Sequence, residues 1–181
     1  MYPQVSIITV CFNSEKTIKD TIESVLNQTY RNIEYILLDG KSTDKTVEII
    51  KSYQEDFKKK EIPYSWISEL DKGIYDAMNK GILKANGEII GIINSDDWYD
   101  NNAVLEVVKK YKNQDNIIIS GEVYKVDFHK KARGVRYNKR KINTNIYKTM
   151  PINHPATFVH KKVYEKIGLF DIQYKLSADY D

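Results

Sequence analysis

Short apolar runs alternate with amphipathic stretches along the first two thirds of the chain. The runs are rich in β-branched residues and predict strands at Val5–Val10, Ile33–Asp39, Tyr64–Glu69 and Glu88–Asn94. Between them, apolar residues recur at helical spacing and predict helices through Ile18–Leu26, Val47–Phe57, Ile74–Ile82 and Ala103–Tyr111. Strands that alternate with helices of this length predict an α/β fold with a mainly parallel sheet covered on both faces.

Polar and glycine residues mark where several of these elements begin and end. Ser14 is the expected N-cap of the first helix, and Ala85-Asn86-Gly87 is the expected stop of the third. Beyond Asn116 the pattern changes, because a long strand candidate at 117–128 leads into a polar and basic stretch that runs to Met150. We expect antiparallel strands and a loop in this part of the chain.

Composition narrows the class of protein. With 181 residues and 41% hydrophobic content, the chain can bury one core and suits a single domain over residues 1–181. A net charge of +3, from 28 basic and 25 acidic residues, does not suit a polycation that coats nucleic acid. The lone cysteine, Cys11, excludes an internal disulfide framework and fits a reducing compartment. No apolar run approaches the roughly 20 residues that span a bilayer, and no signal peptide precedes the first strand, so we expect a cytoplasmic protein.

Polar residues follow several of the predicted strands: Asn13, Asp39, and the pair Asp96-Asp97. Because the carboxyl ends of parallel strands meet at one edge, where such sheets bind ligands, these side chains should lie close together. An Asx turn or a helix cap would explain Asp39 alone, but the helix after Asp97 already has cap candidates at 100–102. Adjacent carboxylates repel one another, so the pair indicates a bound cation, and hard oxygen ligands suit Mg²⁺ or Mn²⁺.

Two long segments carry a resemblance to a known family. They are SIITVCFNSEKTIKDTIESVLNQTYRNIEYILLDGKSTDKT and SELDKGIYDAMNKGILKANGEIIGIINSDD. The combination of DGKSTDKT, DKGIYDAMNKG and NSDD at strand spacing resembles the family 2 glycosyltransferases of the GT-A fold, close to those that build bacterial surface polysaccharides. The resemblance covers nearly the whole chain. It implies a Rossmann-like nucleotide-binding half at about 1–100 and a smaller antiparallel acceptor-side half at about 101–181. Relatives continue past the final SADYD, so we expect a C-terminal truncation.

The resemblance assigns donor-binding roles to residues at the strand ends. Asp39 would accept a hydrogen bond from the ring N–H of the base, normally uracil. Asp96 would contact the ribose hydroxyls. The residues that would border the nucleotide are Thr9, Cys11 and Asn13. Asp71 either faces the nucleotide as well or is a solvated loop carboxylate.

The resemblance also implies a metal site. NSDD would be this chain's version of the DxD motif, with Asn94 where many relatives have Asp. Asp97 would bind the Mn²⁺ or Mg²⁺ that bridges the donor diphosphate. Many relatives carry Arg at the position of Met78, which here falls on the apolar stripe of its helix, so we expect Met78 in the core. Lys72, Lys80 or the basic loop would then balance the phosphates.

Two residues near the end of the chain complete the implied site. Asp179, in SADYD, matches the catalytic base of the family. His154, in MPINHPATF, matches a His that lies near the donor phosphates or the acceptor in close relatives. Read alone, Asp179 is an ordinary surface acid or a helix cap, and a lone His is more often structural.

The implied reaction is inverting transfer of a sugar from a nucleotide-sugar, normally a UDP-sugar, to a saccharide or lipid-linked acceptor in cell-surface polysaccharide synthesis. One alternative is a catalytically silent nucleotide-sugar binding module. Another is a sugar nucleotidyltransferase, but such enzymes normally need a Gly-rich phosphate loop, and TVCFNSEKT has no glycine. Neither GxGxxG nor GxxxxGK[ST] occurs, which argues against a dehydrogenase or a kinase.

The strongest charge cluster is the run His129–Lys141. Such a run is usually a solvated loop. Two functional interpretations remain open: attraction to the anionic inner face of the membrane, which implies a peripheral location, or contact with a lipid diphosphate acceptor. We do not expect a nucleic-acid partner, because Tyr137 alone in this run offers a stacking surface.

Overall fold

The computed structural model describes residues 2–111, 114–127, 130–136 and 153–174, and its centre is a six-stranded sheet with the order β3-β2-β1-β4-β8-β5. The strands are β1 (Val5–Cys11), β2 (Ile33–Asp39), β3 (Tyr64–Ser68), β4 (Ile89–Asn94), β5 (Ile118–Ser120) and β8 (Thr157–His160). Neighbours among β1, β2, β3 and β4 are parallel, whereas β8 runs antiparallel to both β4 and β5. The predicted mainly parallel α/β sheet is confirmed.

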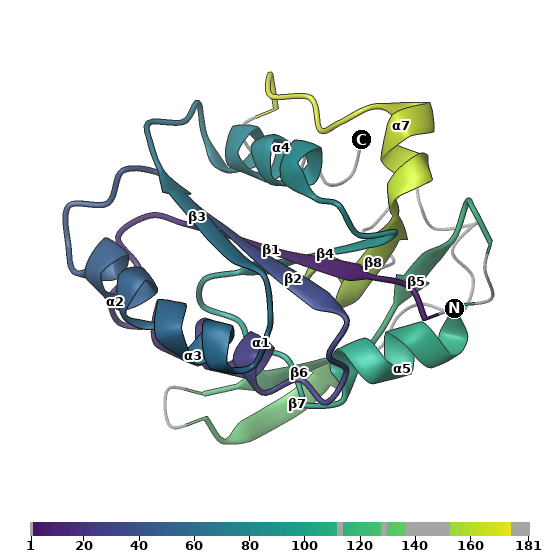
Figure 1. Ribbon diagram of the computed structural model, residues 1–181, viewed down its shortest axis with the longest axis horizontal. Helices are drawn as coiled ribbons and strands as arrows, with labels where there is room; N and C mark the ends of the chain where they lie inside the picture. The colour runs from purple at the N-terminus through teal and green to yellow at the C-terminus, as the bar shows by residue number, and fades with distance from the viewer. Residues whose placement is uncertain (1, 112–113, 128–129, 137–152, 175–181) are drawn as a thin grey trace.

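Helices cover both faces of this sheet (Figure 1). One face packs against α1 (Ile18–Leu26), α2 (Thr46–Ser52), α3 (Gln54–Lys59) and α5 (Ala103–Lys110), and the other against α4 (Ile74–Lys84) and α7 (Lys161–Ile167). Each face has its own apolar core. Every residue of β1 and β2 is buried because both faces of these strands are covered.

Several elements differ from the sequence predictions. The helix expected through Val47–Phe57 is broken at Tyr53, whose N–H bonds to the Ile50 carbonyl three residues back, so α2 and α3 are separate. Ser14 does not cap α1 with its side chain, because its hydroxyl bonds to Ser95 and to the Phe12 carbonyl. Ile74 is 45% exposed, so the buried stripe of α4 consists of Tyr75, Ala77, Met78, Gly81 and Ile82.

The strand expected at 117–128 is two strands, β5 and β6 (Val123–Val126), which belong to different sheets. β6 pairs with β7 (Ala132–Arg136) in a small antiparallel sheet, so residues 132–136 of the basic run form a strand. β8 and α7 were not predicted. β8 can approach β4 closely because residue 91 is glycine: a Cβ there would lie 2.4 Å from the Phe158 ring. Among the helices within the described residues, none has the length and apolar character needed to cross a membrane.

Candidate functional site

The carboxyl ends of the four parallel strands meet at one edge of the sheet. Register pairs join Cys11 of β1 to Asp39 of β2, and Asp39 to Ser68 of β3. On the other side of β1, Val10 pairs with Asn94 at the end of β4. The sheet therefore brings Asp39 and the loop that carries Asp96 and Asp97 to the same edge, as the strand pattern predicts.

Asp39 is a buried carboxylate with several hydrogen-bond donors. Its side chain accepts bonds from the Ser42 N–H at 3.0 Å, from the Ser68 hydroxyl at 2.5 Å and from the Ser42 hydroxyl. The Cys11 thiol lies 3.7 Å from the same carboxylate and from the Leu38 carbonyl. Burial, and then the negative charge of Asp39, raise the pKa of the Cys11 thiol, so this cysteine is an unreactive neighbour of the site.

The loops that follow β1 and β2 are joined to each other by side-chain to backbone hydrogen bonds. Asn13 adopts a left-handed backbone conformation, with φ of +48°, which asparagine tolerates better than most residues. Its side-chain oxygen accepts the Thr43 N–H at 2.9 Å, and its own N–H donates to the Ser42 hydroxyl at 2.8 Å. Asn13 thus fixes the loop that carries the donors to Asp39, and this structural role accounts for its side chain.

Asp71 lies directly over the end of β2. A Cβ placed on Gly40 would be 2.8 Å from an Asp71 carboxylate oxygen, so glycine is what lets this carboxylate approach the backbone. The other oxygen accepts the Gly73 N–H at 2.9 Å, which fixes the side chain. Asp71 is thus partly buried against Gly40, the residue after Asp39, and its role towards a nucleotide stays a prediction.

The acidic pair is held by α1 and by the loop after β1. The Thr21 hydroxyl donates to the Asp97 carbonyl at 2.7 Å, and the Ser14 and Ser95 hydroxyls lie 2.8 Å apart. The Asp97 carboxylate accepts only a long contact, 3.5 Å, from the Asn94 amide. Burial, and then the charge of Asp96, raise the pKa of Asp97, so its ionised form lacks compensation. Within the described residues, the Asp96 side chain has no hydrogen-bond or ion-pair partner.

These residues fit a hard divalent cation. Besides the two carboxylates, the side-chain oxygen of Asn94 is buried and has no hydrogen-bond partner in the described part of the protein. Such oxygens are the ligands that Mg²⁺ and Mn²⁺ prefer. No group of three or more His, Cys, Asp or Glu residues in the described ranges is arranged to hold a metal. This does not conflict with the fit, since Mg²⁺ usually keeps several waters and takes substrate phosphates as ligands.

Other predicted residues lie elsewhere or outside the described ranges. Thr9 is fully buried in β1 and accepts the Tyr35 hydroxyl at 3.0 Å, an interaction that explains its polar side chain without a ligand. The His154 ring packs 6.5 Å from that of Phe170, centroid to centroid, at the side of the sheet covered by α4. Asp179 lies outside the described residues.

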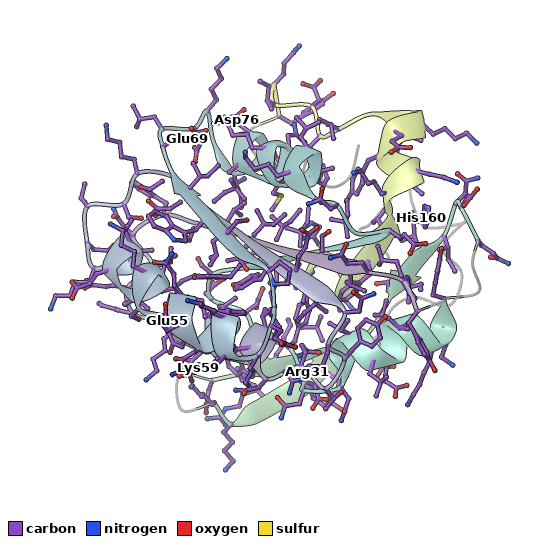
Figure 2. The ribbon with its side chains drawn as sticks, viewed as in Figure 1. Arg31, Glu55, Lys59, Glu69, Asp76 and His160 are labelled. Atoms are coloured by element: carbon purple, nitrogen blue, oxygen red, sulfur yellow. The ribbon has the colours of Figure 1, made fainter. Side chains whose placement is uncertain are left out.

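The structure narrows the choice of basic side chain that would balance the donor phosphates. Met78 is 2% exposed and belongs to the core, as predicted. Lys80 is bound by Glu69 at 2.8 Å and by Asp76 at 3.2 Å, and both acids are labelled near α4 in Figure 2. Lys80 is therefore committed to a surface ion-pair network, which leaves Lys72 and the basic run as the candidates.

Sequence reasoning missed three serine and threonine residues that position the site. Ser68 donates to Asp39, Ser95 bonds to Ser14, and Thr21 holds the Asp97 carbonyl. Ser68 had one available signal, since it is a polar residue at the end of a predicted strand, like Asp39. Thr21 gives no signal in the sequence, because its role depends on how α1 packs against the loop after β4.

Known proteins resemble this chain in sequence. The model of the family described as "Glycosyl transferase family 2" matches residues 6–168. An uncharacterized glycosyltransferase of Rickettsia typhi is 31% identical over 190 residues, which cover 99% of this chain and 57% of that protein. The chain therefore spans little more than half the length of this relative.

Solved structures resemble the fold. S. aureus TarS 1-349 in complex with UDP aligns with a TM-score of 0.75 at 19% identity, covering 98% of this chain and 53% of that one. The mannosyltransferase PcManGT from Pyrobaculum calidifontis, in complex with GDP-Man and Mn²⁺, aligns with a TM-score of 0.69 at 18% identity, covering 95% and 48%. These similarities confirm the predicted GT-A fold class.

Proposed function

The chain belongs to glycosyl transferase family 2, and on that premise we propose that it transfers a sugar from a nucleotide-sugar to an acceptor hydroxyl. The observation that carries the proposal is the convergence, at one sheet edge, of the buried Asp39 with the adjacent carboxylates Asp96 and Asp97. The nucleotide complexes of TarS and PcManGT give further support.

The proposed donor is a UDP-sugar. Asp39 accepts hydrogen bonds only, so it suits a ring N–H of the base, and the two serines hold it in place for that contact. Cys11, Asn13 and Asp71 border the same place, and Asp96 is the proposed partner of the ribose hydroxyls. Thr9 bonds to Tyr35 in the core, so it is left out of these proposed contacts.

Asp97, with Asp96 beside it, is the proposed holder of Mn²⁺ or Mg²⁺. When bound, the cation would neutralise the oxygens of the departing diphosphate. The half-buried position of Asp97 strengthens this interaction, because a charge is screened less away from solvent. The Thr21 bond to the Asp97 carbonyl fixes the backbone from which the carboxylate projects.

We propose transfer with inversion and Asp179 as its base. The bond from the acceptor oxygen to the anomeric carbon forms as the bond from that carbon to the diphosphate breaks, and Asp179 takes the acceptor proton. A base of this kind contributes a factor of about 10² to 10⁴ in rate. His154 is proposed to lie near the donor phosphates or the acceptor.

The experiment that separates an enzyme from a silent binding module measures nucleoside diphosphate release. The chain is incubated with UDP-, GDP- and dTDP-sugars and Mn²⁺, and the free nucleoside diphosphate is quantified. Release of UDP above the rate in buffer is expected. Tight nucleotide binding with no release from any sugar would instead favour the binding module.

Asp97→Asn tests the metal part of the proposal. Because the amide removes the charge but keeps the shape, Mn²⁺-dependent UDP binding measured by calorimetry should weaken at least tenfold, which is about 1.4 kcal/mol. Asp115→Asn, at an exposed aspartate whose partner is Lys162, is the matched control and should bind UDP like the wild type. Unchanged UDP affinity in Asp97→Asn would remove Asp97 from the metal site.

A further inference from the structure

A large cavity opens beside the acidic pair, on the side away from Asp39. Its volume is about 1300 Å³. Its walls come from the loop after β4, from α5, from the β5–β6 segment, and from Pro155, Ala156 and Phe158. Pockets for small molecules usually measure about 300–1,000 Å³. The cavity therefore has room for more than a single sugar ring.

The strand order gives this cavity a position relative to the donor. Asp39 and Ser68 lie at the ends of β2 and β3, the acidic loop follows β4, and the cavity lies towards β8 and β5. Asp96 and Asp97 therefore stand between the proposed base-binding place and the cavity. A transferase must hold its second substrate across the reacting centre from the nucleotide, and the cavity is in that position.

Two aromatic side chains offer their rings to this space. Trp98 is 40% exposed and Tyr124 is 66% exposed, and both line the cavity. The Lys130 amine lies 5.6 Å from the centroid of the Trp98 ring and forms an ion pair of 2.7 Å with Asp20 of α1. This contact anchors the indole from one side. Exposed, anchored rings are suited to pack against the C–H faces of a pyranose.

The charges around the cavity give no net attraction for an anionic ligand. Its described lining has five acidic residues, Asp96, Asp97, Asp100, Glu106 and Glu122, and three basic ones, Lys110, Lys125 and Lys130. One of the basic residues, Lys130, is already paired with Asp20. One of the acids, Glu106, is likewise paired with Lys109. With a cation held at Asp96 and Asp97, the three remaining acids equal the three lysines in number, so the lining offers a phosphate-bearing acceptor no net positive charge. Carboxylates readily accept hydrogen bonds from sugar hydroxyls. A hydrocarbon chain would have to desolvate these charged groups, which is costly.

We propose that this cavity binds the acceptor, and that the acceptor is a neutral saccharide packed against Trp98 and Tyr124. The inference rests on the proposed glycosyl transfer and makes its acceptor more specific. It favours a saccharide over a lipid diphosphate at this cavity, and it makes Trp98 and Tyr124 determinants of acceptor binding rather than of donor binding.

Trp98 itself supplies the signal for a test. The chain has two tryptophans, so Trp66→Phe leaves Trp98 as the only one. Its fluorescence is followed, with UDP and Mn²⁺ present, during titration with neutral tetrasaccharides of glucose, galactose, mannose and N-acetylglucosamine. Farnesyl diphosphate is the anionic lipid comparator. Saturation-transfer NMR with the same compounds on the unmutated chain gives a readout that does not depend on the Trp66 substitution.

At least one tetrasaccharide should change the Trp98 emission in a saturable manner, and farnesyl diphosphate should not. Tyr124→Ala should weaken that saccharide about tenfold, because the loss of one stacking ring is worth roughly 1 kcal/mol or slightly more. Tyr2→Ala, at an exposed tyrosine outside the cavity, is the control and should leave the affinity unchanged. Binding of farnesyl diphosphate in preference to every saccharide, or equal saccharide affinity in Tyr124→Ala, would overturn the assignment.

UDP calorimetry on the same preparations separates this inference from the proposed function. If UDP binds in a metal-dependent manner and no tetrasaccharide binds, the cavity assignment is wrong and the transferase proposal stands. If UDP does not bind, the proposed function fails first.

Discussion

Asp39 has more hydrogen-bond donors than a surface carboxylate normally finds. Three donor groups from Ser42 and Ser68 converge on it, and it is only 2% exposed. A buried carboxylate with this many donors has a fixed orientation. Any oxygen lone pair that remains free to accept a further hydrogen bond therefore has a fixed direction too. This fixed orientation is what the proposed contact between Asp39 and a base requires.

Replacing Asp39 by Asn tests this residue. The amide nitrogen would face donors instead of accepting from them, so we expect a loss of about 1–3 kcal/mol in unfolding free energy. UDP binding, measured by calorimetry, should weaken at least tenfold. Ser68→Ala is the comparison: it removes one donor but keeps the carboxylate, so it should affect UDP binding less than Asp39→Asn does. Wild-type UDP affinity in Asp39→Asn would contradict the proposed contact with the base.

The polar residues at strand ends could be predicted from the sequence because strand boundaries are marked by composition. Asp39, Asp96 and Asp97 all follow apolar runs, and the structure brings them to one edge. Ser68 carries the same signal, but its partner lies 29 residues away, so its bond to Asp39 could not be assigned without the register of the strands. Thr21 carries no such signal, because its bond to a residue 76 positions away depends on helix packing. The buried bond between Thr9 and Tyr35 was missed because it also depends on the register of the strands.

At the scale of elements, another carboxylate joins several elements at the amino ends of the parallel strands, opposite the site. Glu34 of β2 accepts hydrogen bonds from the Ser6 hydroxyl of β1 at 2.5 Å and from the Asn86 N–H at 2.6 Å. It also accepts the Gly87 N–H at 3.1 Å, in the turn between α4 and β4. One side chain thereby ties two strands and a turn together at the end of the sheet remote from the site.

The stability that Glu34 provides should depend on pH. Burial raises the pKa of Glu34, but the hydrogen bonds from Ser6, Asn86 and Gly87 outweigh it and lower the pKa below the ordinary value of 4.5. A lowered pKa in the folded state means that the contribution is complete above the unfolded-state pKa and is lost as the pH falls through the folded-state pKa.

Glu34→Gln should therefore lower the unfolding free energy at pH 7 by about 1–3 kcal/mol, because its amide meets donors. The difference in unfolding free energy between this variant and the wild type should decrease in acid, below the ordinary pKa of 4.5. Denaturant titrations at several pH values measure this difference. Glu55→Gln, on an exposed residue of α3 labelled in Figure 2, should leave stability unchanged. If the difference in unfolding free energy stayed constant down to acidic pH, the claim that these donors stabilise the ionised Glu34 carboxylate would be wrong.

Some strands and helices could be predicted from the sequence and others could not. Long buried strands and amphipathic helices such as β2 and α5 follow from their own pattern. β8 does not, because it is only four residues long and exists through antiparallel pairing with β4 and β5. That pairing needs Gly91 opposite Phe158, a contact that no local pattern reveals.

At the scale of the whole molecule, the strand order arranges the proposed functions in a line. The base-binding carboxylate belongs to β2, the acidic pair follows β4, and the aromatic cavity lies towards β8 and β5. In this order the parallel half of the sheet carries the proposed nucleotide residues, whereas the antiparallel strands supply walls of the proposed second-substrate cavity. Family membership was predictable from the motifs at strand spacing, but the cavity was not, because its walls come from segments far apart in the sequence.

The most direct test of the central claim is a crystal structure of the chain with UDP and Mn²⁺, with the metal located by its anomalous scattering. We expect a manganese peak between Asp97 and the diphosphate, with the uracil ring N–H donating to Asp39. A manganese peak away from the acidic pair, or a uracil ring that makes no contact with Asp39, would contradict the proposal.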